Sequence, residues 1–198
     1  MTARFQIKVG GLHSIGVLVP EFRPTHLLGI LDPPTPEPAL YDHDPHSRTT
    51  LLLRFQDIDA SQPDGPTAAH VEQIIAFADR VCSAHALAPA RLLVHCHAGI
   101  SRSTASAYIA LARDLGVDRA DSAFRELLRI TVNPWPNRRL VALADNALGA
   151  NGRLLAPLDA YREANIERLE SMMAYHRQLM ESARADATDP AADGDPGR

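Results

Sequence analysis

The residues best suited to chemistry form one run, His95-Cys96-His97-Ala98-Gly99-Ile100-Ser101-Arg102-Ser103. Five residues separate Cys96 from Arg102, so a nucleophile begins this loop and a fixed cation ends it. A loop of this kind can turn its backbone N–H groups toward a phosphate. The planar guanidinium of Arg102 can hold two phosphate oxygens. The same positive surroundings favour the thiolate form of Cys96, which is the nucleophilic form. These residues predict a phosphate-ester hydrolase.

A strand, a tight loop and a helix must position these residues. The apolar run Leu92-Leu93-Val94 precedes the loop and favours a buried strand. Residues 103–116 follow with a helical pattern that ends at Gly116. Cys96 then lies at the carboxyl end of a strand, where α/β proteins bind their ligands. Arg102 lies at the positive end of a helix dipole.

The run resembles the signature of the cysteine-dependent protein tyrosine phosphatases, H-C-x-x-G-x-x-R-S/T. Every specified position is filled, by His95, Cys96, Gly99, Arg102 and Ser103. The resemblance implies that Cys96 is the nucleophile and that Ser103 stabilises its sulfur as the leaving group in the second step. It implies further that the substrate phosphate is bound by the residues from the cysteine to the arginine, namely His97, Ala98, Gly99, Ile100, Ser101 and Arg102.

A carboxylic acid near the loop must protonate the leaving oxygen as it departs. The resemblance to the dual-specificity branch implies that this acid follows the strand that lies one helix upstream of the signature. Asp57 is the first choice, Asp59 the second and Asp64 the third. Pro136-Asn137 is similar to a Pro-Asn element that follows the signature in the same branch. The low-molecular-weight phosphatases fit less well, because their cysteine lies near the N-terminus and their acid lies downstream.

Strands that alternate with helices favour an α/β layer architecture. The apolar patterns predict strands at residues 5–9, 26–31, 51–55 and 92–95, and helices at residues 66–82, 103–116, 119–130 and 138–148. Residues 12–22 fit either a short helix or a strand. Together with the resemblance, the order of elements predicts a short central mixed β-sheet flanked by helices. This is the protein tyrosine phosphatase-like, dual-specificity-like fold, expected as a catalytic domain over residues 1–150.

The C-terminal part of the chain has a different pattern. Residues 151–182 are predicted to be an amphipathic helical extension, whose apolar stripe comprises Tyr161, Ile166, Leu169, Met173 and Leu179. We expect this helix to pack on the flank of the catalytic domain, and a homodimer or partner contact through it is the alternative. Residues 183–198 are small, acidic and contain Pro and Gly, which predicts a disordered tail.

The composition of the chain indicates its cellular compartment and excludes some classes of binding partner. The 198 residues are 45% hydrophobic with a net charge of −4, which gives no bulk attraction to nucleic acid or to an anionic membrane. Cys82 and Cys96 are the two cysteines, so there is no disulfide framework, and a catalytic thiolate needs a reducing setting. No segment approaches the roughly 18 apolar residues of a membrane span, and residues 1–5 lack the apolar core of a signal peptide. A cytoplasmic enzyme is expected.

Neither a metal nor a cofactor is expected. His95-Cys96-His97 and the pair His43 and His46 meet no zinc-ligand spacing. Cys82 falls on the apolar stripe of its predicted helix, where packing is the expected role and a redox partnership with Cys96 is the minority alternative. His95 is expected to support the loop or to pack in the core.

Two other functions use a similar loop. A rhodanese-type sulfurtransferase also carries a cysteine between a strand and a helix, but the pair Arg102-Ser103 and the upstream Asp57 favour a phosphatase. A phosphate-binding pseudophosphatase would lack the cysteine, the arginine or the acid. The expected substrate is a phosphorylated protein, phosphotyrosine above all. The loop carries no lysine-rich sequence that would favour a phosphoinositide, and the sequence shows no basic face that would favour RNA.

Overall fold

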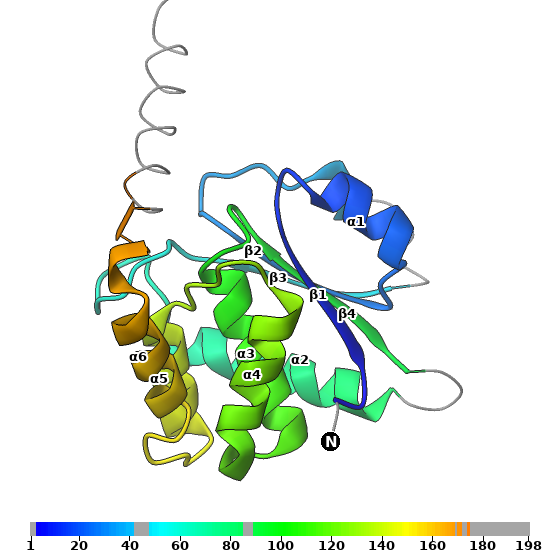
Figure 1. Cartoon of the computed structure of the whole chain (residues 1–198). Coiled ribbons are helices and arrows are strands. Elements are labelled where there is room, and N and C mark those ends of the chain that lie inside the picture. Colours follow the sequence, from blue (N-terminus) through cyan, green and yellow to red (C-terminus); the bar gives the residue numbers. More distant parts are fainter. Residues whose placement is uncertain (1–2, 42–47, 85–88, 169, 172–173, 175–198) are drawn as a thin grey trace, which may run out of the picture. The chain divides into compact units, whose positions relative to one another are not determined.

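The computed structural model describes residues 3–41, 48–84, 89–168, 170–171 and 174 (Figure 1). It contains a four-stranded sheet with the order β1-β4-β2-β3. The strands are β1 (Gln6–Gly11), β2 (His26–Leu31), β3 (Thr49–Arg54) and β4 (Arg91–Cys96). Each overlaps a strand predicted from the sequence, so the expected α/β architecture is confirmed.

The expectation of a mixed sheet is wrong for the described residues, since all of the strand pairs are parallel. Parallel neighbours require a crossover that returns the chain to the starting end of the sheet. The helices α1 (Ile15–Phe22) and α2 (Ala68–Ser83) are two such crossovers. The described part of the connection between β2 and β3 includes the short 3-10 helix η1 (Ala39–Tyr41). All of the strands therefore end at the same edge.

Helices lie on both faces of the sheet. Figure 1 shows α1 on one face and, on the other, the group that includes α2, α3 (Arg102–Leu115), α4 (Ala120–Ile130) and α5 (Arg138–Ala147). A short 3-10 helix, η2 (Val117–Arg119), joins α3 to α4. The helices α2, α3, α4 and α5 agree with the sequence predictions to within about two residues at each end, which is the usual scatter of helix boundaries.

The helix α3 forms the centre of the core. All of its residues from Arg102 to Ala112 are buried. Four alanines in this stretch let the neighbouring helices approach closely, and Tyr108 adds one large side chain whose hydroxyl donates to the carbonyl oxygen of Leu154 at 3.1 Å. A helix buried on every side has little freedom to move, so its first residue, Arg102, is held on a rigid support.

The segment that fitted either a helix or a strand forms the helix α1 after a turn at residues 12–14. Among its residues Ile15 is buried, while Val17 is 60% exposed. Because apolar residues stand on both the buried and the exposed side of this helix, they repeat with neither a helical nor a strand period. The sequence pattern therefore did not decide between a helix and a strand. Arg23 ends the helix in a left-handed conformation, with φ of 48°.

The chain divides into two compact units, with the boundary between Ala160 and Tyr161. The helix α6 spans Leu155–Ala164. Leu169, Met173 and Leu179 of the predicted apolar stripe, and all of residues 183–198, lie outside the described residues. In the part of the chain that is described, no helix has both the length and the apolarity to cross a membrane.

Candidate active site

The loop between β4 and α3, residues 96–102, is here named the phosphate loop. Two other segments brace its backbone. The N–H of Leu12 donates to the carbonyl oxygen of His97 at 2.9 Å, and the N–H of Trp135 donates to that of Ile100 at 2.9 Å. The Thr104 hydroxyl also donates to the carbonyl oxygens of Ile100 and Ser101. The loop is therefore fixed by contacts from both sides before any ligand binds.

Gly99 makes the tight curve of the loop. Its φ is +78°, and a Cβ atom there would stand 2.6 Å from the carbonyl carbon of Gly10 and 2.6 Å from the nitrogen of Gly11. A side chain would therefore be disfavoured twice, by the positive φ and by overlap with the backbone at the end of β1.

We expect Gly99→Ala to lower the free energy of unfolding by at least about 2 kcal/mol and to weaken phosphate binding. Thermal denaturation and inorganic phosphate titration would measure the two effects. Gly149→Ala is the matched control, because Gly149 has φ of +61° but no atom within 4 Å of the position that an alanine methyl group would take. Equal losses in both variants would show that contact with β1 contributes nothing.

Cys96 lies at the base of the loop, where it is 1% exposed. Its Sγ is 3.2 Å from Ser103 Oγ, and the N–H of Gly99 donates to the same sulfur at 3.2 Å. A hydroxyl and an amide that point at one sulfur can stabilise negative charge on it. The contact with Ser103 is the one that the resemblance assigned to the leaving thiolate.

Arg102 is 3% exposed and is held along one edge of its guanidinium. Its Nη1 donates to Asp32 Oδ1 at 2.7 Å and to the carbonyl oxygen of Phe55 at 2.6 Å. Its Nε is buried, has no hydrogen-bond partner among the described residues, and lies 3.8 Å from Asp57 Oδ2. A buried donor without a partner is costly, so this edge of the guanidinium is suited to receive a phosphate oxygen.

Asp32 was not among the residues predicted to form the site. It follows the last residue of β2, and the prolines after it indicated only a loop. The signal that could have found it was its position, because the carboxyl ends of parallel strands share one edge of a sheet. By the same rule Asp57, which follows β3, lies at this edge.

Of the three candidate acids, Asp57 lies at the phosphate loop. Its Oδ1 accepts hydrogen bonds from Ser101 Oγ at 2.7 Å and from Asn137 Nδ2 at 2.8 Å. Asp59 instead accepts from the N–H of Arg138, the first residue of α5, at 2.8 Å. Asp64 occupies a turn with φ of 62°, where its main-chain oxygen accepts from another loop residue. Of these three residues, Asp57 is therefore the one whose carboxylate contacts the phosphate loop, whereas Asp59 contacts the start of α5 and Asp64 forms part of a turn.

His95 is fully buried and its Nε2 is hydrogen-bonded to the Tyr41 hydroxyl. Burial lowers the pKa of His95 to about 4, against the raising effect of a main-chain contact with Cys96. Burial likewise raises the pKa of Tyr41. The absence of a side chain at Gly29 makes room for this pair, since a Cβ there would overlap the Tyr41 hydroxyl. A neutral, enclosed imidazole is suited to support the loop rather than to exchange protons with a substrate.

The remaining polar candidates form no second centre. His97 is half-buried at the rim of the loop. Within the described residues, no group of three or more His, Cys, Asp or Glu side chains could hold a metal ion, and His43 and His46 lie outside those residues. Cys82 is a free thiol 3.4 Å from Asp114 Oδ1, and burial together with that carboxylate raises the pKa of its thiol to about 12. Such a thiol is a poor nucleophile.

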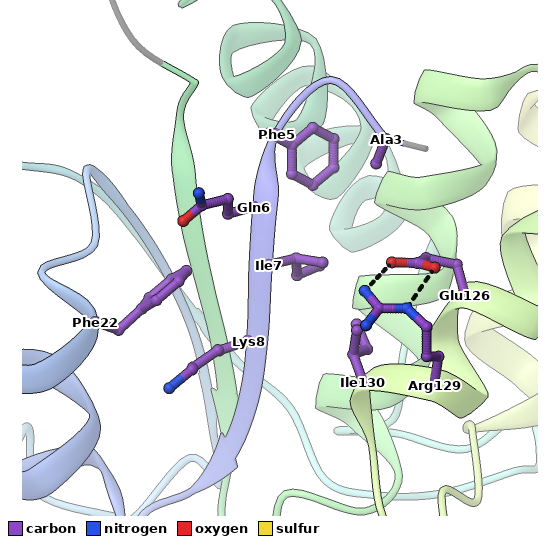
Figure 2. Close-up of a pocket in the computed structure, with 9 residues that line it drawn as sticks. All are labelled: Ala3, Phe5, Gln6, Ile7, Lys8, Phe22, Glu126, Arg129 and Ile130. Carbon is purple, nitrogen blue, oxygen red and sulfur yellow. Dashed lines mark hydrogen bonds and ion pairs between the residues drawn. The ribbon is translucent and has the colours of Figure 1, made fainter. Parts of the chain in front are cut away.

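A pocket of about 300 Å³ lies away from this loop, along the first half of β1. Figure 2 shows β1 running through its lining, with Lys8 and Phe22 on one side of that strand and the ion pair of Glu126 with Arg129 on the other. The phosphate loop is at the carboxyl ends of the strands, whereas this pocket begins at the amino end of β1. None of the residues predicted for catalysis lines it.

No protein-family profile and no curated protein matches the sequence. Solved structures do match the fold. Human DUSP28 is 19% identical, with a TM-score of 0.54 over 73% of this chain and 92% of its own. The Yvh1 phosphatase domain from Chaetomium thermophilum is 19% identical, with a TM-score of 0.55 over 78% of this chain and 95% of its own.

A third similar structure is that of PTPMT1 in complex with PI(5)P. It is 13% identical, with a TM-score of 0.53 over 75% of this chain and 94% of its own. Structural similarity at these identities establishes the fold but not the reaction, which must be argued from the residues of the site. The chain has the fold of the dual-specificity branch of the cysteine-dependent protein tyrosine phosphatases.

Proposed function

We propose that this protein is a cysteine-dependent phosphatase that hydrolyses phosphate monoesters through a phosphocysteine intermediate. One observation carries the proposal. The buried sulfur of Cys96 lies at one end of the phosphate loop, and the buried Nε of Arg102, without a hydrogen-bond partner in the described part of the chain, lies at the other. The first-turn amides of α3 add further donors, because the hydroxyl of its N-cap residue, Ser101, makes no capping bond there.

In the first step, Arg102 and the loop amides hold the phosphate oxygens while the Cys96 thiolate attacks phosphorus. The S–P bond forms as the bond to the leaving oxygen breaks, and Asp57 gives its proton to that oxygen. Preorganised donors around the transferring group supply much of the rate in such sites. The products of this step are the free alcohol or phenol and the phosphocysteine.

In the second step, the ionised Asp57 takes a proton from a water that attacks phosphorus. The S–P bond breaks and the electron pair returns to Cys96 as a thiolate. Ser103 Oγ, 3.2 Å from the sulfur, stabilises that charge. Inorganic phosphate leaves and Asp57 is again protonated, so the cycle requires neither metal nor cofactor.

The proposed substrate is a phosphorylated protein, with phosphotyrosine preferred. Arg102 pairs with the carboxylates of Asp32 and Asp57, and it is the one lysine or arginine in the phosphate loop. Two carboxylates beside a single cation suit one phosphate group better than a polyphosphorylated headgroup. A phosphoinositide is the second candidate, because the similar PTPMT1 structure holds PI(5)P.

We also propose residues 1–150 as the catalytic domain, the extension of residues 151–182 as its flanking helix, and the reducing cytoplasm as the compartment. The two free cysteines suit that compartment. A homodimer through the extension is the alternative to packing on the flank. Analytical ultracentrifugation of the full chain and of a version that ends at residue 160, the boundary of the first compact unit, would distinguish them.

The first experiment measures hydrolysis of p-nitrophenyl phosphate across pH in the presence of a chelator. A comparison of phosphotyrosine peptide, phosphoserine peptide, phosphoinositide and RNA 5′-phosphate then ranks the substrates. Metal-free turnover with phosphotyrosine ahead supports the proposal. Binding of phosphate without turnover of any of these substrates would mark a pseudophosphatase, and sulfur transfer from thiosulfate to cyanide would mark a sulfurtransferase.

We expect Asp57→Asn to lower kcat by roughly a hundred- to ten-thousand-fold and to remove the decline in rate at high pH, because the amide cannot donate the required proton. Asp59→Asn is the matched control and should remain close to wild type, since its retained oxygen still accepts from the N–H of Arg138. The pH profiles of kcat for both variants test this. If Asp59→Asn loses the high-pH decline instead, Asp59 is the acid.

A further inference from the structure

Asn137 connects three parts of the site. It is 1% exposed and is the N-cap residue of α5, where its Oδ1 accepts from the N–H of Leu140 at 2.9 Å. Its own N–H donates to the carbonyl oxygen of Ser101 in the phosphate loop at 3.3 Å. Its Nδ2 donates to Asp57 Oδ1 at 2.8 Å and to the carbonyl oxygen of Ile58 at 3.3 Å.

These contacts fix which way the amide faces. The N–H of Leu140 requires an acceptor, while the carbonyl oxygen of Ile58 requires a donor, so rotating the amide by 180° would lose both bonds. The NH₂ group of Asn137 must therefore point at Asp57. This side chain is held by its own partners and cannot turn to accept a proton from the carboxyl.

The contacts of Asn137 make the two carboxyl oxygens of Asp57 different from each other. Oδ1 receives hydrogen bonds from both Asn137 and Ser101, so it acts as the acceptor oxygen of this carboxyl group. Oδ2 lies 3.8 Å from Arg102 Nε, on the side where that guanidinium edge can receive phosphate. The proton that reaches the leaving group must then be carried on Oδ2.

We propose that Asn137 is a positioning residue that holds Asp57 Oδ1 and so directs the protonated Oδ2 toward the leaving oxygen. This inference rests on the proposed phosphatase function. Ser101 contributes the second donor, and its hydroxyl serves Asp57 instead of capping α3. The acid, the phosphate loop and the start of α5 thereby keep one geometry, which is the purpose of preorganisation in a catalytic site.

The experiment compares two substrates that differ in their need for an acid. Phenyl phosphate has a leaving group that must be protonated, whereas the leaving group of 2,4-dinitrophenyl phosphate departs without a proton. We expect Asn137→Asp to reduce kcat for phenyl phosphate on the order of tenfold to a hundredfold, below the full effect of removing an acid. Its rate with 2,4-dinitrophenyl phosphate should change little, and its high-pH decline should shift.

Asn137→Asp keeps an oxygen to cap α5 while it replaces the donor to Asp57, so its fold should persist, and thermal denaturation checks this. Arg139→Ala is the matched control, because it perturbs the first turn of α5 through contacts with Pro66 and Ser61 and does not touch Asp57. Equal losses with both substrates and an unchanged pH profile would overturn the inference. If wild type turns over neither substrate, the proposed function itself has failed.

Discussion

Replacing Cys96 by serine should abolish phosphate-ester hydrolysis while the protein stays folded. The hydroxyl is a far weaker nucleophile than a thiolate at neutral pH, and no neighbouring base in the proposed cycle takes its proton. Loss of the nucleophile in an enzyme with a covalent intermediate costs on the order of 10⁶-fold in kcat. Steady-state hydrolysis of p-nitrophenyl phosphate measures the loss.

Two controls accompany this variant. Serine fits the volume of Cys96 and can keep the contacts with Ser103 and the N–H of Gly99, so inorganic phosphate should still bind and the melting temperature should change little. Ser103→Ala should leave the first step intact but slow release of the thiolate, which would appear as a burst of product before a slower steady state. Turnover by Cys96→Ser within a hundredfold of wild type would rule out the phosphocysteine mechanism.

Replacing Arg102 by lysine should be nearly as damaging although the charge is retained. Arg102 uses Nη1 to reach Asp32 and the carbonyl oxygen of Phe55, and in the proposed function its remaining edge binds phosphate. The single ammonium group of a lysine cannot hydrogen-bond to Asp32 and Phe55 on one side and to a phosphate on the other at the same time. Removing one well-placed donor to a transition-state oxygen costs roughly a hundred- to a thousandfold in kcat, and we expect Arg102→Lys to lose at least that.

Asp32→Asn is the matched control for this prediction. The amide oxygen can still accept from Arg102 Nη1, so the guanidinium keeps its orientation and the loss of kcat should be much smaller. Substrate affinity should rise, because one negative charge beside the phosphate is removed. Measurements of kcat and KM for the two variants separate these effects. An Arg102→Lys enzyme within tenfold of wild type would show that orientation of the guanidinium is not required.

The contiguous part of the site was the part that could be predicted from the sequence. Cys96, Gly99, Arg102 and Ser103 lie within one strand–loop–helix unit, where spacing along the chain determines spacing in the fold. The structure brings Asp57 to the same loop, because a position just after a buried strand is also a position at the ligand-binding edge. Which of its two oxygens faces Arg102 depends on contacts that no spacing encodes.

Asp32 was not predicted as part of the site, and Asn137 was predicted only as part of a Pro-Asn element, without its contact to Asp57. Asp32 begins a proline-rich connection, and Asn137 resembles an ordinary helix cap, which it also is. Their second roles arise from contacts 70 and 80 positions away along the chain. Strand direction was predicted wrongly for a related reason, because it depends on the course of the connections, whereas the alternation of apolar residues is the same in parallel and antiparallel strands.

The residues of the site come from distant parts of the chain, and this affects when the site forms during folding. The contacts of Arg102 with Asp32 and Phe55, and that of Asn137 with Asp57, close loops of 70, 47 and 80 positions. Contacts between distant parts of a chain form slowly, because the entropy of closing the loop is lost before the contact forms. A nascent chain that has emerged only as far as α4 already holds the complete cysteine signature but lacks Asn137, which donates a hydrogen bond to Asp57. Under the proposed mechanism, competence for catalysis is therefore acquired late, with α5, and not when the signature itself is synthesised.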